Sequence, residues 1–215
     1  MDSKSPLKVL ILGGSGRTGK ETVKLALKKG WKVRSVTRNL SKVPKFEEGE
    51  VEWIEGSVTD PEIVKKAVKD QDAIISTIGP DGLGKTTLYS DSAKIIIDAM
   101  NEAKIKRLLI VSSERESPAI NWLGKNFMKL VLGELMKDVA RMEEIFSGLQ
   151  NSEIEWTIVR PFRLFDKKFT GKYRVGPGDL KPTFGAKTRR PDLADFLVKE
   201  LTEKNWVKKF VTIGK

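Results

Sequence analysis

The chain has 215 residues, neither cysteine nor histidine, and a formal net charge of +11. The missing residue types exclude disulfides, thiolate or histidine catalysis and metal sites built on those ligands, so we expect no metal. The basic residues are interleaved with acidic ones. This pattern is typical of a solvated surface that favours polyanionic small ligands, and we expect no nucleic-acid binding. The N-terminus is polar and no apolar run approaches transmembrane length, so we expect a cytoplasmic protein without a membrane segment.

A glycine-rich turn between a strand and a helix is the first feature of the chain. The apolar run Lys8–Leu12 ends at the glycines, and a helical pattern begins directly after them. The glycines fit a dinucleotide-binding fingerprint either as Gly14-x-Gly16-x-x-Gly19 or as Gly13-x-x-Gly16-x-x-Gly19. In both alignments one glycine makes the tight turn, one admits a pyrophosphate, and the last lets the helix pack on the strand. The helix N-terminus would direct its free N–H groups at the phosphates.

The remaining sequence alternates strands with helices. We expect strands over 31–37, 51–55, 72–78, 107–112, 155–159 and 207–213, and helices over 20–29, 61–68, 87–103, 122–149 and 192–202. The longest helix has a possible break near Gly133, and residues 162–190 are predicted to be irregular and to cap the sheet. This alternation predicts one α/β domain over residues 1–215: a doubly wound parallel sheet of about seven strands, a Rossmann fold, with helices on both faces.

The end of the second strand indicates which dinucleotide binds. Sites selective for NAD place an acidic residue there, which holds the ribose hydroxyls. This chain has Arg38 at that place, followed by Lys42. An arginine would pair with a 2′-phosphate, and Arg17 in the glycine turn could add a second positive charge. The predicted cofactor is therefore NADP(H).

A series of short segments covers almost the whole chain in the order seen in one family. They are the glycine turn, Arg38, Gly-Ser-Val-Thr-Asp (56–60), Ile-Ser-Thr-Ile-Gly-Pro (75–80), Leu-Ile-Val-Ser-Ser (109–113), Trp-Thr-Ile-Val-Arg-Pro (156–161) and Arg-Arg-Pro-Asp-Leu-Ala (189–194). These segments resemble the NmrA-like group of the atypical short-chain dehydrogenase/reductase superfamily, and within it biliverdin-IXβ reductase/flavin reductase. The resemblance implies an NADPH-dependent reductase of a conjugated acceptor, either a flavin or a biliverdin-like tetrapyrrole.

The resemblance also implies roles for residues at the strand ends. The pyrophosphate would be bound by Gly13, Ser15, Gly16, Arg17 and Thr18, and the 2′-phosphate by Arg38 and Lys42. The adenine would lie beside Ser57 and Val58. The nicotinamide half would lie along Gly79, Ser112, Ser113, Pro161 and Phe162. Two positions depart from the family. Relatives usually carry aspartate where Ser57 stands, and small or imidazole side chains where Phe162 and Arg163 stand.

The tyrosine–lysine pair of ordinary short-chain dehydrogenases is missing. Tyr89 and Tyr173 are the two tyrosines, and neither has a lysine four residues later. Reduction of a conjugated acceptor needs less acid–base help, because the protein can hold the acceptor against the nicotinamide while water supplies a proton.

The candidate catalytic residues are therefore few. Ser113 would orient the nicotinamide or the acceptor, and Lys125 or Arg163 would pair with the acceptor's acidic groups. Trp122 and Phe162 would form stacking walls. Two alternatives stay open: Trp122 as a core aromatic and Lys125 as a solvated lysine.

Two other functions have to be weighed. The missing pair and the basic surface are also compatible with a non-catalytic NADP(H)-sensing regulator of the NmrA type that binds a partner protein. For either function we expect a monomer or a small homo-oligomer. Residues 79–86 fit the phosphate-loop pattern GxxxxGK(S/T). No aspartate follows the later strands as a magnesium partner, and Pro80 lacks an N–H for a phosphate, so we interpret this match as coincidence.

Overall fold

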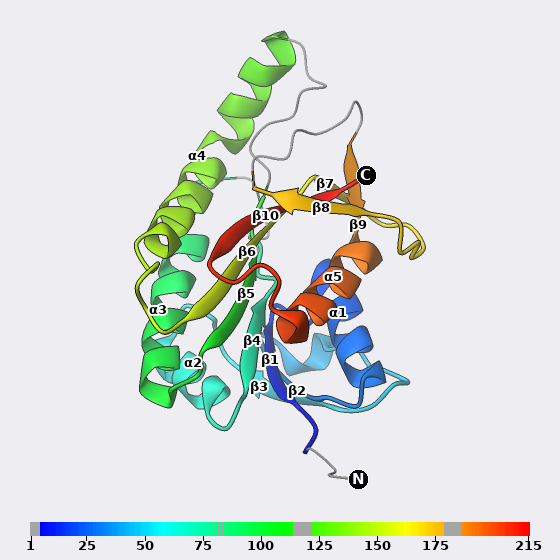
Figure 1. Ribbon diagram of the computed structural model, residues 1–215. Helices are drawn as coiled ribbons and strands as arrows, with labels where there is room; N and C mark the ends of the chain where they lie inside the picture. The colour runs from blue at the N-terminus through cyan, green and yellow to red at the C-terminus, as the bar shows by residue number, and fades with distance from the viewer. Residues whose placement is uncertain (1–4, 81, 83, 114–121, 179–185) are drawn as a thin grey trace.

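The computed structural model describes residues 5–80, 82, 84–113, 122–178 and 186–215, and only the backbone of 122–132. Its centre is a sheet of eight strands in the order β3-β2-β1-β4-β5-β6-β10-β8 (Figure 1). In that order the strands are β3 (Val51–Glu55), β2 (Lys32–Thr37), β1 (Lys8–Leu12), β4 (Ala73–Ser76), β5 (Arg107–Val111), β6 (Glu155–Pro161), β10 (Lys209–Gly214) and β8 (Arg174–Pro177). All pair in parallel except β8, which is antiparallel to β10.

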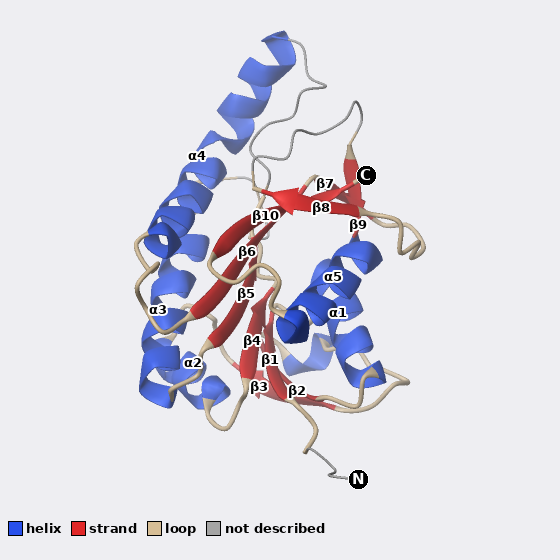
Figure 2. Ribbon diagram, viewed as in Figure 1, coloured by secondary structure: helices blue, strands red, loops and turns tan. Residues whose placement is uncertain are grey.

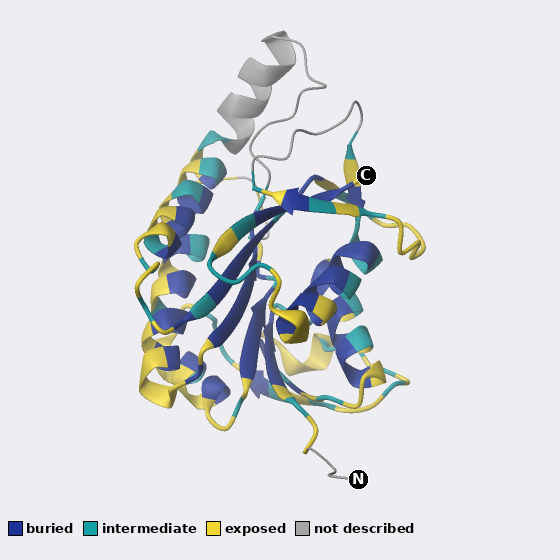
Figure 3. Ribbon diagram, viewed as in Figure 1, coloured by how far each residue is buried: buried dark blue, intermediate teal, exposed yellow. Residues whose placement is uncertain are grey.

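Helices cover both faces of the sheet, as Figure 2 shows. They are α1 (Arg17–Lys28) and α5 (Arg190–Glu203) on one face, and α2 (Pro61–Val68), α3 (Leu88–Ala103) and α4 (Trp122–Ser147) on the other. Strand β1 shows why its sequence is continuously apolar. Leu10 and Leu12 pack toward α2, α3 and α4, whereas Val9 and Ile11 pack toward α1 and α5. Both sides of the central strands are thus buried (Figure 3), as expected in a parallel sheet.

The predicted doubly wound parallel sheet with helices on both faces is confirmed. The sheet has eight strands, close to the expected number of about seven. The prediction that residues 162–190 are irregular is wrong in part, because they contain β8 and a small parallel pair, β7 (Arg163–Phe165) with β9 (Lys187–Arg189). α4 also continues through Gly133 without a break. Across the part of the chain that the structure describes, no helix combines the length and apolar character needed to cross a membrane.

The glycine turn joins β1 to α1, and its backbone favours the second alignment of the fingerprint. Gly13 has a φ of +78°, the left-handed region, and a Cβ there would lie 3.0 Å from the backbone of Thr77. Its carbonyl oxygen accepts the N–H of Gly16 at 2.9 Å. A Cβ on Gly19 would overlap that same carbonyl oxygen. Gly13, Gly16 and Gly19 therefore have the turn and packing roles that the fingerprint requires.

We expect Gly19→Ala to lower the free energy of unfolding by about 1–3 kcal/mol, because the new methyl group must displace backbone. Gly133→Ala is the matched control, since it is also a glycine inside a helix but a Cβ there meets nothing within 4 Å. This control should be neutral or stabilise by up to about 1 kcal/mol. Urea denaturation followed by circular dichroism measures both. Equal unfolding midpoints for Gly19→Ala and the wild type would contradict the packing role.

Candidate functional site

A cavity of about 320 Å³ lies at the carboxyl edge of the sheet. The segments that follow β1, β2, β3 and β4 line it together. The residues are Gly13, Ser15, Gly16, Val36, Thr37, Arg38, Gly56, Ser57, Val58, Thr77, Ile78, Gly79, Pro80 and Leu88. Seven residues expected at a dinucleotide site are among them: Gly13, Ser15, Gly16, Arg38, Ser57, Val58 and Gly79. The sequence analysis missed Thr77, Ile78 and Leu88, which approach the cavity from the end of β4 and the start of α3.

The N-terminus of α1 borders this cavity. Gly16 is the residue that precedes the helix, so no side chain caps it, and the first turn contains no acidic residue. The N–H groups of that turn therefore have no carboxylate or hydroxyl partner from the cap position, and the partial positive charge of the helix is not neutralised there. A glycine turn, an uncapped helix N-terminus and a cavity beside them fit the pyrophosphate of a dinucleotide.

The N-terminus of α3 is arranged differently. The carboxylate of Asp138, which is fully buried on α4, accepts the N–H of Tyr89 at 2.8 Å and the hydroxyl of Ser90 at 2.5 Å. The hydroxyl of Thr86 accepts the N–H of Leu88 at 3.1 Å. A phosphate at this helix would have to displace a buried carboxylate. This arrangement supports the interpretation of 79–86 as a coincidental match, although residues 81 and 83 lie outside the described part.

Arg17 lies on the outer side of the glycine turn. Its guanidinium pairs with the carboxylate of Asp166, which also accepts a 2.7 Å hydrogen bond from Arg190 at the start of α5. The Arg17 and Asp166 side chains are both more than half exposed, so this pair is screened by water and weak. Arg17 can therefore leave Asp166 when a phosphate offers a second partner. Asp166 is a contact of the glycine turn that no sequence pattern indicated.

The second half of the carboxyl edge is formed by the ends of β5 and β6. Ser112 is buried, and its hydroxyl donates to Glu143 of α4 at 2.7 Å. Ser113 follows and is partly buried. Pro161 is the last residue of β6. Phe162 is only 4% exposed. Its ring packs directly against Gly214 of β10, so closely that a Cβ on Gly214 would overlap the ring. The Phe162 ring is thus part of the packing between β6 and β10, and it does not line the described cavity.

Three other expected site residues are not among the residues that line the cavity. Thr18 is buried within the first turn of α1, Lys42 is exposed in the short 3-10 helix Leu40–Lys42, and Arg163 is exposed on β7. The side chains of Trp122 and Lys125 lie outside the described residues.

Neither tyrosine is activated as a base. Burial and the charge of Asp138 raise the pKa of Tyr89, and burial together with a 2.7 Å hydrogen bond to Asp195 raises the pKa of Tyr173. Tyr173 lies against α5. The Tyr89 hydroxyl is 3.6 Å from where a Cβ on Gly79 would lie, so a protonated phenol stands beside the end of β4. The sequence analysis dismissed Tyr89 because it lacks a lysine partner.

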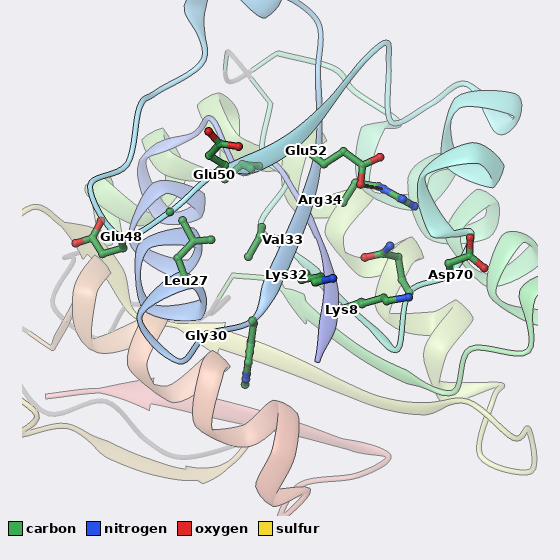
Figure 4. A pocket seen from close by; sticks show the side chains of 14 residues that line it. Lys8, Leu27, Gly30, Lys32, Val33, Arg34, Glu48, Glu50, Glu52 and Asp70 are labelled. Carbon is green, nitrogen blue, oxygen red and sulfur yellow. Dashed lines mark ion pairs between the residues drawn. The ribbon is translucent and has the colours of Figure 1, made fainter. Parts of the chain in front are cut away.

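A larger groove of about 610 Å³ lies at the opposite, amino edge of β1, β2 and β3 (Figure 4). Its lining mixes Lys8, Lys32 and Arg34 with Glu48, Glu50, Glu52 and Asp70. Arg34 pairs with Glu52 at 2.9 Å, the ion pair drawn in Figure 4. The groove contains neither the glycine turn nor a helix N-terminus. It therefore lacks the features that fit a dinucleotide at the carboxyl edge.

Comparison with known proteins gives one family. The model of a family described as NAD(P)H-binding matches residues 13–204. The uncharacterized protein YwnB of Bacillus subtilis is 30% identical over 183 residues, which cover 81% of each chain. The photosystem II assembly factor Ycf39 of Trieres chinensis is 28% identical over 72% of this chain, which spans only 45% of that protein. Among solved structures, ChuY of Escherichia coli O157:H7, an anaerobillin reductase, superposes with a TM-score of 0.74 at 24% identity, covering 96% of each chain.

The occupied N-terminus of α3 predicts that ATP does not bind at residues 79–86. Isothermal titration of the protein with Mg·ATP should show no micromolar binding. Lys85→Ala should leave the response to nucleotides unchanged, because Lys85 is exposed and does not line the cavity. Micromolar ATP affinity that is lost in Lys85→Ala would overturn the interpretation.

Proposed function

Because the chain belongs to the NAD(P)H-binding family, we propose that it is an NADPH-dependent oxidoreductase that transfers hydride to a conjugated acceptor, a flavin or a biliverdin-like tetrapyrrole. One observation carries the cofactor part of the proposal. Arg38, at the end of β2, lines the same cavity as the glycine turn, and none of the described residues that line this cavity is acidic. An arginine at this place favours a 2′-phosphate, whereas NAD sites use an acidic residue there.

The chain's own residues would bind the dinucleotide in an extended form along the carboxyl edge. The first turn of α1 would donate N–H groups to the pyrophosphate. Arg38 would hold the 2′-phosphate, with Ser57 and Val58 beside the adenine. Gly79 would lie on the path toward the other half of the edge. There the segment around Ser113 would border the nicotinamide.

The acceptor part of the proposal follows from the absence of an activated tyrosine. Reduced nicotinamide supplies a hydride when it is bound, and a conjugated acceptor can take that hydride and spread the resulting charge over its ring system. The protein then has to hold the acceptor against the nicotinamide, and one proton can come from solvent. The reductase ChuY supports an acceptor of the bilin type by similarity of fold.

A second candidate is a non-catalytic NADP(H) sensor that binds a partner protein. The similarity to Ycf39, an assembly factor, favours it, although this chain spans less than half of that protein. The same cavity would then bind the dinucleotide without turnover. The two candidates differ in one measurable respect, the oxidation of NADPH in the presence of an acceptor.

We predict that Arg38→Ala weakens NADPH binding by about 10- to 100-fold, the loss expected for a hydrogen bond to a charged group. NADH affinity should stay the same, because NADH has no 2′-phosphate. Fluorescence titration of each nucleotide measures both. Arg174→Ala is the matched control, since it removes an exposed arginine of β8 at the far edge of the sheet, and it should bind both nucleotides like the wild type. Equal losses for NADPH and NADH would contradict the role of Arg38.

We predict that the wild-type protein oxidises NADPH when FMN, riboflavin or biliverdin is added, and does so faster than it oxidises NADH. The decrease of reduced-nicotinamide absorbance under anaerobic conditions measures this activity. A reaction without protein is the control. NADPH binding without acceptor-dependent oxidation would contradict the reductase and favour the sensor.

A further inference from the structure

We propose that Glu143 is a positioning residue for the nicotinamide half of the site. The proposal deepens the proposed function and rests on it. The carboxylate of Glu143 is nearly fully buried on α4, at the carboxyl ends of β5 and β6. The glycine turn and Arg38 lie at the ends of β1 and β2, where the pyrophosphate and the adenosine would bind. The nicotinamide would then lie at the ends of β5 and β6, which is where the Glu143 carboxylate is found.

Both oxygens of Glu143 are used. One accepts the hydroxyl of Ser112 at 2.7 Å and Nε of Arg160 at 2.9 Å, and the other accepts a second guanidinium nitrogen of Arg160 at 2.8 Å. A two-point arginine–carboxylate pair fixes both planes and leaves little rotational freedom. The remaining guanidinium nitrogen donates to the carbonyl oxygen of Gly178 at 3.0 Å, and the guanidinium lies 4.6 Å from the centre of the Phe210 ring.

This network holds the two segments that would border the nicotinamide, the one after β5 and the one at the end of β6. Ser112 immediately precedes Ser113, and Arg160 immediately precedes Pro161. The N–H of Ser112 also donates to Val159 at 2.8 Å, so the ends of β5 and β6 are joined by backbone and by side chains. Glu143 ties both strand ends to one rigid point on α4. Glu143 therefore acts through Ser112 and Arg160, the two side chains that its carboxylate holds.

A second buried arginine–glutamate pair lies at the amino edge of the sheet, where the strands begin. Arg107, the first residue of β5, pairs with Glu200 of α5 at 2.9 Å, with side chains 5% and 1% exposed. Arg107 begins β5 and Ser112 directly follows its last residue. The two residues are therefore five positions apart in extended chain, a separation of about 16 Å. The Arg107–Glu200 pair therefore provides a matched control, because it is at least as buried as the Glu143–Arg160 pair but lies far from the carboxyl edge.

The experiment compares two ligands and four proteins. NADPH carries the nicotinamide, whereas 2′,5′-ADP contains only the adenosine and its phosphates. Both affinities are measured by calorimetry for the wild type, Glu143→Gln, Ser112→Ala and Glu200→Gln, at a temperature where circular dichroism shows each protein to be folded. Ser112→Ala is the milder variant, since it removes one hydrogen bond without leaving a buried charge unpaired. FMN reduction is followed in parallel.

We expect Glu143→Gln to weaken NADPH binding about three- to tenfold, the equivalent of one hydrogen bond, while the affinity for 2′,5′-ADP stays within about twofold. Ser112→Ala should show the same selective loss to a smaller extent, and Glu200→Gln should show none. In the FMN assay, kcat should fall in Glu143→Gln by about 10- to 100-fold, because the reacting groups are misaligned.

Equal weakening of both ligands in Glu143→Gln would overturn the proposal, and so would a selective loss in Glu200→Gln. The binding comparison does not depend on turnover. If the wild type reduces no acceptor, the reductase is wrong, but a selective loss of NADPH affinity still supports Glu143 as a positioning residue. If the wild type does not bind NADPH at all, both are wrong.

Discussion

The parallel arrangement of the strands is the constraint on which the candidate site depends. Because β1 to β6 run in the same direction, each strand delivers its following residues to one edge of the sheet. Covering both faces with helices makes that edge the place where polar side chains can gather around a ligand without disturbing the core. The cavity at the ends of β1, β2, β3 and β4 follows directly from this arrangement.

Helix N-termini at this edge differ in how their N–H groups are satisfied, and that difference separates a binding site from a structural contact. Asp60 caps α2 from the preceding residue, and Asp138 fills the N-terminus of α3 from a neighbouring helix. α1 begins at a glycine and has no such partner from a cap side chain. An anionic ligand therefore gains more at α1 than at α2 or α3. The dinucleotide fingerprint at α1 and the phosphate-loop pattern before α3 are distinguished in this way, because a carboxylate fills the N-terminus of α3 and none caps α1.

Local sequence was enough to predict the elements and much of the site. β3 and α2 have the predicted bounds, since glycine or Pro61 limits them, and the strand-end rule brought Arg38, Ser57 and Gly79 to one cavity. What could not be predicted depends on distant partners. β8 contains a glycine and a proline and becomes a strand by pairing with β10. Likewise, nothing near Glu143 in sequence indicates that it meets Ser112 and Arg160, and Phe162 packs into the core only because β10 lies beside it. The roles of the site residues stay predictions.

A crystal structure of the protein grown with NADP⁺ tests the central claim most directly. The account predicts the pyrophosphate at the N-terminus of α1, against Gly13 and Gly16, and the 2′-phosphate beside Arg38. The nicotinamide should lie toward the ends of β5 and β6. A nucleotide found in the groove at the amino edge, or at residues 79–86, would contradict the account.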